Sequence, residues 1–180
     1  HDHLIVYPKN EQLKFYMVAN YLMYKNGEFP EYDRYNAELE ANLARDLVEI
    51  EKAADAWAYD YAKKQVAFRA EHPDLPHYFI GSGNQYGATY SYAMCYWEEQ
   101  MWIRTKSISC QEFFHGMQEI IVADTPVTLF MGEDEQRPLA ERVARFLPRV
   151  CANYTIIDTK EFALEGISPE FRGTISHLVM

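Results

Sequence analysis

Positive charge is scarce in this sequence. Its 17 lysines and arginines are outnumbered by 27 aspartates and glutamates, which gives a net charge of −10. The acidic excess is concentrated in residues 28–60, where ten acids and three bases give a net charge of −7. A protein that binds the phosphate backbone of nucleic acids needs a basic stripe or patch. We therefore exclude broad nucleic-acid binding.

Cysteine is also rare, and long apolar runs are missing. The three cysteines (Cys95, Cys110 and Cys151) form no Cys-x-x-Cys pair and no Cys/His cluster. This pattern argues against a structural zinc site and against a disulfide framework. No apolar run has the length needed to span a bilayer, and no signal peptide is recognisable. We expect a cytoplasmic protein that contacts no membrane and needs no metal or other cofactor.

Both ends of the sequence are unusual. The chain begins with His1-Asp2-His3 rather than Met, and it ends at Met180 within an apolar stretch that has no helix-stop signal. A metal ion bound by both His1 and His3 is one explanation for the two histidines at the start of the chain. We favour a different explanation, in which the chain is a segment of a longer protein trimmed at both ends.

The order of the predicted elements indicates an α/β fold. Apolar residues at helical spacing predict a helix from an N-cap at Asn10 to Gly27, and one long helix or two abutting helices over 34–70. Strands are predicted near 77–81, 105–109, 127–131 and 154–158, and further helices over 84–103, 112–121 and 138–146. Alternating strands and helices imply a parallel sheet with helices on both faces. We expect a three-layer αβα sandwich over 71–180, with residues 1–70 as a helical lead-in packed on its outside.

A glycine-rich loop connects the first predicted strand to the next helix. Residues 81–87 read Gly-Ser-Gly-Asn-Gln-Tyr-Gly. Unpaired N–H groups at such a helix N-terminus favour anions. The spacing is not that of the dinucleotide-binding fingerprint, and residues 101–104 contain no acid to hold a ribose. A tight strand-to-helix turn explains the loop equally well, so both interpretations stay open.

Two side chains that follow are candidates for proton transfer. Glu99 lies one predicted helical turn from apolar residues on both sides. An unpaired carboxylate is costly to bury, so Glu99 is either a general base or is paired with Arg104 or Lys106. His115 has a side chain suited to proton transfer near neutral pH, although a structural hydrogen bond would also explain it. Cys110 is the one candidate nucleophile, and we do not favour it.

The segments around these residues resemble a known family. Residues 81–88, the apolar stretch up to Glu99, and residues 112–116 (Glu-Phe-Phe-His-Gly) resemble the second sugar isomerase (SIS) half of phosphosugar-processing enzymes. The specific signal is the last string, with Glu99 sixteen positions before His115. Within that superfamily the sequence is most similar to the fructosamine-6-phosphate deglycases, which act on substrates such as fructoselysine 6-phosphate. The isomerase half of glucosamine-6-phosphate synthase is a more distant relative. The similarity extends to about Asp158 and is weak over residues 1–70.

The resemblance implies a flavodoxin-like SIS fold and roles for particular residues. Glu99 would be the general base and His115 the acid/base histidine that together move a proton between C1 and C2 of an open-chain ketose phosphate. In a deglycase, hydrolysis of the resulting imine releases the amine and glucose 6-phosphate. The histidine of this family often reaches a site in the neighbouring subunit, so a homodimer or higher homo-oligomer is implied. Further substrate contacts would come from Gly81, Ser82, Gly83, Tyr86 and Glu112.

The sequence departs from the family pattern at two positions and leaves other functions open. Met117 stands where the family usually has proline after His-Gly, and Gln111 where a small residue is usual. The family's phosphate-binding Ser/Thr-rich loop and C-terminal tail have no counterpart here, so we expect the chain alone to be inactive. A ketose/aldose phosphate isomerase, a regulatory SIS module that binds a phosphosugar without catalysis, and a pure dimerisation half are the alternatives. The presence of both Glu99 and His115 favours an enzyme.

Overall fold

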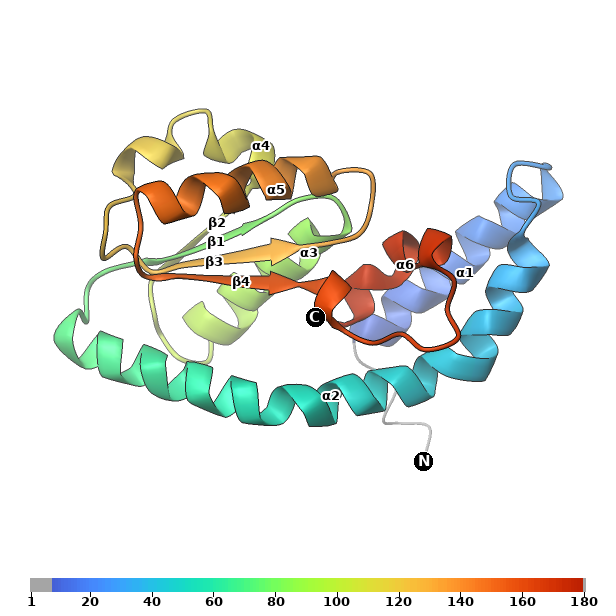
Figure 1. Ribbon diagram of the computed structural model, residues 1–180, viewed down its shortest axis with the longest axis horizontal. Helices are drawn as coiled ribbons and strands as arrows, with labels where there is room; N and C mark the ends of the chain where they lie inside the picture. Colours follow the sequence, from blue (N-terminus) through green and yellow to red (C-terminus); the bar gives the residue numbers. More distant parts are fainter. Residues whose placement is uncertain (1–7, 180) are drawn as a thin grey trace.

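Four short strands form one parallel sheet in the order β2-β1-β3-β4 (Figure 1). The computed structural model describes residues 8–179, with side chains from residue 13 onward. The strands are β1 (His77–Gly81), β2 (Thr105–Ser109), β3 (Val127–Met131) and β4 (Tyr154–Asp158). Ile80 of β1 pairs with Ile108 of β2 on one side and with Leu129 of β3 on the other. The four predicted strands and the parallel αβα arrangement are confirmed.

One face of the sheet is covered by α4 (Cys110–Phe113), a 3₁₀ turn (Met117–Ile120) and α5 (Arg137–Phe146), drawn above the strands in Figure 1. Ile80 and Leu129 point into this layer and are fully buried. Phe113 and Val143 pack against them from the helices. Shorter 3₁₀ turns follow at Leu147–Arg149 and Thr159–Glu161.

The other face is covered by α3 (Asn84–Ser91), a π-helix (Tyr92–Glu98) and part of α2 (Tyr32–Glu71), which lie below the strands in Figure 1. Phe79 and Phe130 point to this side, because successive residues of a strand alternate between faces. Trp97 of the π-helix packs against them, and Tyr61 of α2 is partly buried beside them. Both central strands are thus buried on both faces.

A third apolar cluster lies beyond the carboxyl end of the sheet. It joins the first half of α2 to α6 (Pro169–Ile175) and to the final 3₁₀ turn (Ser176–Val179), with α1 (Pro8–Lys25) alongside. Its members include Tyr35, Leu39, Leu43, Ile175 and Leu178. With 40 residues, α2 is about 60 Å long, so one helix spans this cluster and the sheet. None of the helices within residues 8–179 is long and apolar enough to cross a membrane.

The ends of the early helices agree only in part with the predictions. Asn10 is not an N-cap, because α1 already begins at Pro8. Gly27 does terminate the helix: it adopts a left-handed φ of 77°, and Glu28 N–H donates to the carbonyl of Met23 at 2.8 Å. The region 34–70 is one helix. His1 and His3, for which a shared metal was the less favoured explanation, lie outside the described residues.

Two predicted helices are broken, and one helix was missed. The segment 84–103 changes from α- to π-helix at Tyr92 and ends before Trp102, whose φ is +56°. The segment 112–121 is interrupted at Gly116, where φ is 147°, so only short helical pieces flank His115. The apolar C-terminal stretch forms α6 and a 3₁₀ turn, which the sequence analysis did not assign. The division of the chain at residue 70 stays a prediction.

His77 is a polar group inside the lower layer. Its Nε2 lies 2.9 Å from Oγ1 of Thr128, which Tyr61 also contacts at 2.9 Å. Only 1% of His77 is exposed. Burial, with a smaller contribution from nearby Arg69, lowers the pKa of His77 to about 3. The imidazole is therefore neutral in the folded chain at any pH near neutrality.

This burial predicts a specific loss of stability in acid. As pH falls below 6.5, the ordinary pKa of histidine, the unfolded chain binds a proton that folded His77 does not. The free energy of unfolding should therefore fall by about 2 kcal/mol between pH 7 and pH 5 through this residue. Urea unfolding of wild type and His77→Gln at each pH measures the difference. The dependence should be reduced in His77→Gln; equal slopes in the two proteins would contradict the assignment.

Candidate functional site

Glu99 directly follows the π-helix and is exposed. The expectation that apolar neighbours surround it is therefore wrong for this chain. The reason lies in the helix geometry: Glu99 N–H donates to the carbonyl of Met94, five residues earlier, at 2.9 Å. The wider turn rotates Glu99 away from the neighbours that a helix of 3.6 residues per turn would give it.

The backbone around Glu99 has two uncommon features. Helices of the π type are rare and are frequent at functional sites. Trp102, three residues later, is the one non-glycine residue with positive φ among residues 8–179, and its side chain is 88% exposed. Such backbone conformations cost energy and cluster at functional sites. The alternative pairing of Glu99 with Arg104 or Lys106 is not seen among the described residues, and Arg104 is paired with Asp74 at 3.4 Å.

His115 lies in the turn between α4 and the following 3₁₀ turn. Its side chain is 84% exposed, and its Nδ1 is 3.4 Å from Oε2 of Glu112. Phe113 and Met117 on either side are anchored in the upper apolar layer. The Glu112 carboxylate is thus placed to orient the imidazole of His115. The backbone N–H of Glu112 donates to Ser109 Oγ at 3.4 Å, so Ser109 caps α4.

The sheet separates the two candidate catalytic residues. Glu99 ends a helix that packs on the lower face through Trp97, whereas His115 follows a helix that packs on the upper face through Phe113. Figure 1 shows the strands between these two helical layers. Within one chain, Glu99 and His115 therefore belong to helical layers on opposite faces of the sheet.

The glycine loop follows β1 and is largely occupied by contacts within the chain. Gly81 is buried, and a Cβ there would overlap the hydroxyl of Thr89. Ser82 is 4% exposed and donates to the carbonyl of Gln136 at 3.4 Å. Gly83 has a left-handed φ of 56°, and its N–H donates to Gln136 Oε1 at 3.1 Å. The role of these residues in substrate binding stays a prediction.

A hollow of about 440 Å³ lies beside this loop, where β1 and β3 end. The chain connections leave β1 and β3 in opposite directions across the sheet, and ligands of open α/β sheets bind at such a point. Its walls are acidic: Glu133, Asp134, Glu135 and Glu170 line it. Arg172 pairs with Glu133 at 2.8 Å, and Arg34 pairs with Glu170 at 2.6 Å.

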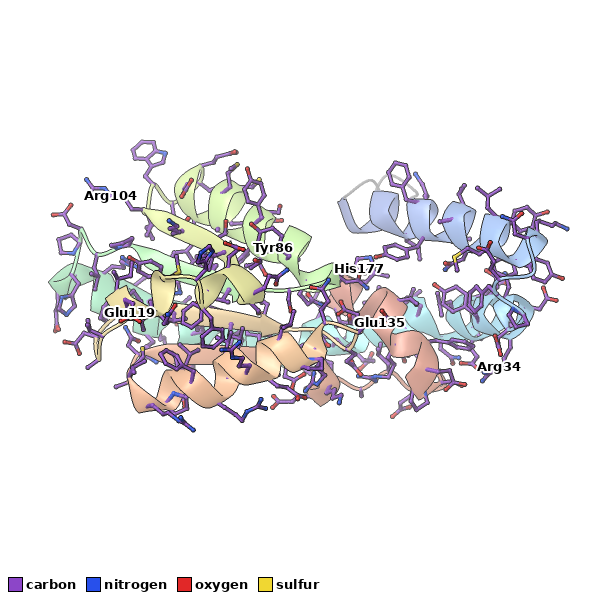
Figure 2. All side chains as sticks on the ribbon, turned by 90° about the horizontal axis from the view of Figure 1, so that it is seen from above. Arg34, Tyr86, Arg104, Glu119, Glu135 and His177 are labelled. Carbon is purple, nitrogen blue, oxygen red and sulfur yellow. The ribbon has the colours of Figure 1, made fainter. Side chains whose placement is uncertain are left out.

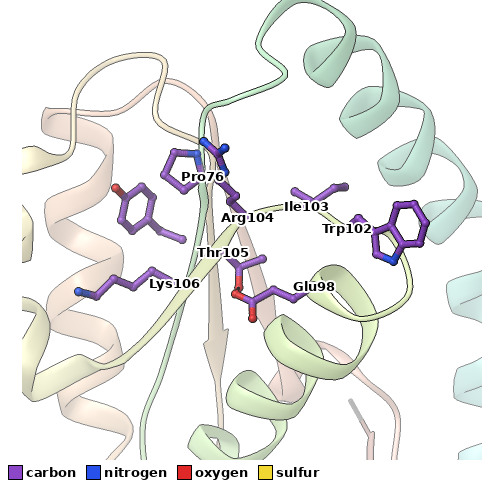
Figure 3. Close-up of a pocket in the computed structure, with 8 residues that line it drawn as sticks. Pro76, Glu98, Trp102, Ile103, Arg104, Thr105 and Lys106 are labelled. Carbon is purple, nitrogen blue, oxygen red and sulfur yellow. Dashed lines mark hydrogen bonds between the residues drawn. The ribbon is translucent and has the colours of Figure 1, made fainter.

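A second, shallower hollow of about 530 Å³ lies at the opposite end of the strands (Figure 3). Glu98 lines it together with Trp102, Arg104 and Lys106. Thr105 Oγ1 donates to Glu98 Oε1 at 2.6 Å, which fixes this carboxylate beside the start of β2. Figure 2 shows Arg104 and Glu135, one beside each hollow, toward opposite ends of the sheet.

The remaining candidates are readily placed. Tyr86 lies on α3 and is 38% exposed (Figure 2), and its role in substrate binding stays a prediction. Cys110 is 1% exposed, and burial raises the pKa of its thiol to about 11, so it is a poor nucleophile. Among residues 8–179, no group of three or more His, Cys, Asp and Glu side chains is arranged to hold a metal ion.

Several residues that shape the site were missed in the sequence. Asp134 accepts from the backbone N–H of Asn84 at 2.6 Å, and Tyr16 of α1 donates to Asn84 Oδ1 at 2.9 Å. Arg137 binds both carboxylate oxygens of Asp158, at 2.8 and 2.6 Å. The one available signal was the polar run 133–137 directly after a predicted buried strand, since neighbouring parallel strands end at the same edge of a sheet.

The chain resembles a curated protein of named activity. It is 34% identical over 128 residues to the fructosamine deglycase FrlB of Bacillus subtilis (strain 168), a match that covers 68% of this chain and 39% of that protein. A solved structure described as a phosphosugar isomerase of B. subtilis is also 34% identical and superposes with a TM-score of 0.63, over 72% of this chain and 39% of the other. The chain belongs to the sugar isomerase (SIS) family.

The shared fold of this SIS domain extends into its first helices. A second structure described as a phosphosugar isomerase, from Salmonella typhimurium LT2, superposes over 89% of the chain with a TM-score of 0.74 at 24% identity. That match covers 48% of the other protein, so the SIS domain spans half or less of the relatives it matches. No model of a known protein family matches the chain.

The burial of Cys110 predicts a simple pattern of thiol reactivity. Cys110 and Cys151 are buried and Cys95 is partly exposed. At pH 8, a thiol with a pKa near 11 has a thiolate fraction about a hundredfold below that of an ordinary thiol. Titration with a chromogenic disulfide should therefore show one fast-reacting thiol, with the others reacting only on unfolding. Cys95→Ser should remove the fast phase; a fast phase that depends on Cys110 would restore it as a candidate nucleophile.

Proposed function

We propose that this SIS domain supplies Glu99 and His115 to the active sites of an enzyme that deglycates fructosamine 6-phosphates. The similarity to the fructosamine deglycase FrlB carries this proposal. Membership of the SIS family, together with the phosphosugar isomerases among its relatives, supports a sugar-phosphate substrate more generally. The exposed position of both residues supports a site that is completed by other protein surfaces.

The chemistry needs one base, one acid and one water. Glu99 removes a proton from C1 of the open-chain fructosamine, and the electrons form a C1–C2 enaminol. A proton delivered to C2, with His115 assisting, gives an imine between C1 and the amine nitrogen. Water adds to C1, the C–N bond breaks, and the amine and glucose 6-phosphate leave. Proton transfers of this kind require a positioned base and a positioned acid.

The separation of the pair supports an active site shared between subunits. Since the sheet lies between Glu99 and His115 of one chain, Glu99 of one copy would act with His115 of another. Exposed apolar side chains near Glu99 favour self-association: Tyr96 and Met101 are each 48% exposed, and Trp102 is 88% exposed. We propose a homodimer or higher homo-oligomer, in the cytoplasm, whose whole activity requires parts beyond this chain.

A complementation experiment tests the shared site. In the full-length protein, Glu99→Gln and His115→Asn should each slow amine release by roughly 10²–10⁴-fold, because each removes a proton-transfer group. Co-expression of the two variants should restore roughly one quarter of wild-type activity, since half of randomly formed dimers are mixed and each mixed dimer has one intact site. The assay follows release of glucose 6-phosphate and amine from a fructosamine 6-phosphate.

The control is co-expression of Glu99→Gln with the double variant Glu99→Gln/His115→Asn, which can form no intact site. Recovery in this control, or its absence in the test pair, would contradict a shared site. Near-normal turnover by Glu99→Gln alone would make Glu99 structural and leave Glu98 or Glu112 as the base. A wild type that interconverts ketose and aldose phosphates without releasing amine would be an isomerase, and one that binds sugar phosphate without turnover would be a regulatory module.

A further inference from the structure

The N-terminus of α3 already holds a negatively charged group. Oδ2 of Asp134, from the loop after β3, accepts the backbone N–H of Asn84 at 2.6 Å. Asn84 is the first residue of α3, so this N–H is one of those that no carbonyl within the helix can satisfy. A carboxylate in this position gains from the partial positive charge of the helix end.

The glycine loop is shaped to admit this carboxylate. Gly83 adopts a left-handed φ of 56°, and a Cβ on Gly83 would overlap the Asp134 carboxylate. The next donor, Gly83 N–H, binds Oε1 of Gln136 at 3.1 Å. Two successive backbone donors of the loop are therefore used by side chains from the loop after β3.

Neighbouring elements hold Asp134 and Asn84 in place. The other oxygen of Asp134 accepts the backbone N–H of Gln136 at 2.8 Å. The Asn84 side chain accepts from Tyr16 at 2.9 Å and donates to the carbonyl of Gly173 in α6 at 2.7 Å. Burial, and then the charge of Asp134, raises the pKa of Tyr16. Contacts from α1, α6 and the loop after β3 thus converge on the first residue of α3.

The surroundings oppose a second anion. Glu133 and Glu170 line the adjoining hollow and are paired with arginines, but Asp134 and Glu135 form no ion pair with a described residue. A phosphate at the glycine loop would have to displace the Asp134 carboxylate and lie among these acids. Like charges at such short separations repel strongly in a partly buried site.

We propose that the Asp134 carboxylate occupies the anion-binding position at the glycine loop of this domain and thereby prevents phosphate from binding there. As long as Asp134 is ionised and accepts the hydrogen bond from Asn84 N–H, the loop Gly81–Gly83 does not bind the phosphate group of a sugar phosphate. That group must then be held by residues other than this loop. The inference concerns phosphate recognition alone and does not depend on the deglycase assignment.

Amide NMR spectra of the 180-residue chain, recorded with increasing inorganic phosphate, test the proposal. In wild type the amides of Gly83 and Asn84 should not shift in a saturable way. In Asp134→Ala the signals of both amides should shift together and saturate. The apparent Kd for phosphate should be about tenfold or more below the lower limit that the wild-type titration sets at the same amides.

The matched control is Glu135→Ala, which removes the same charge from the same loop but leaves the Asp134 contact intact, and it should behave as wild type does. Saturable shifts of Gly83 and Asn84 in wild type, or in Glu135→Ala as strongly as in Asp134→Ala, would overturn the proposal. A folded Asp134→Ala that shows no such shifts, or shows them only at other amides, would do the same. Should Asp134→Ala fail to fold, Asp134→Ser, which keeps a short polar side chain, replaces it with the same criteria.

Discussion

The parallel sheet is the constraint on which the rest of this molecule depends. Its central strands β1 and β3 are buried on both faces, so the helices that cover them lie in two separate layers. The layer below the strands carries Glu99, and the layer above carries His115. Trp97 anchors the first layer and Phe113 the second in the core. The active site shared between subunits, proposed above, would use both residues without disturbing either layer.

The carboxyl end of the sheet is held together mainly by ion pairs and hydrogen bonds. Asp158 is bound by both terminal nitrogens of Arg137. Burial acts to raise the pKa of Asp158, but Arg137, together with the backbone N–H and the charge of Lys160, holds this pKa below its ordinary value. Asn84 adds a junction of backbone and side-chain contacts to the same edge. Where an open α/β sheet usually receives its ligand, this domain therefore has a tightly connected, acidic surface, which is unlike the basic or neutral cradle expected for a phosphate.

Apolar surface is unevenly distributed between the ends of the molecule. The outer face of α1 exposes Phe15, Val18 and Leu22, each more than half accessible. Trp102, beyond the π-helix, is even more exposed. A helix that is apolar on more than one side is normally covered by other protein surface. Exposed apolar patches mark contact surfaces. Additional protein surface over either region would remove these side chains from water.

Strand positions, the parallel sheet and the SIS relationship were determined by the sequence itself. Short apolar runs bounded by proline and glycine specify buried strands, and the spacing of Glu99 and His115 is a linear signal. Only the tertiary structure decided three other features: the π-helix before Glu99, the helix break at Gly116, and the hydrogen bond from Asn84 N–H to Asp134. Each depends on contacts between segments distant in sequence or on packing against the sheet, which propensity and periodicity do not record. The same reason explains why Glu99 was expected among apolar neighbours: an α-helical period was assumed where packing imposes a wider turn.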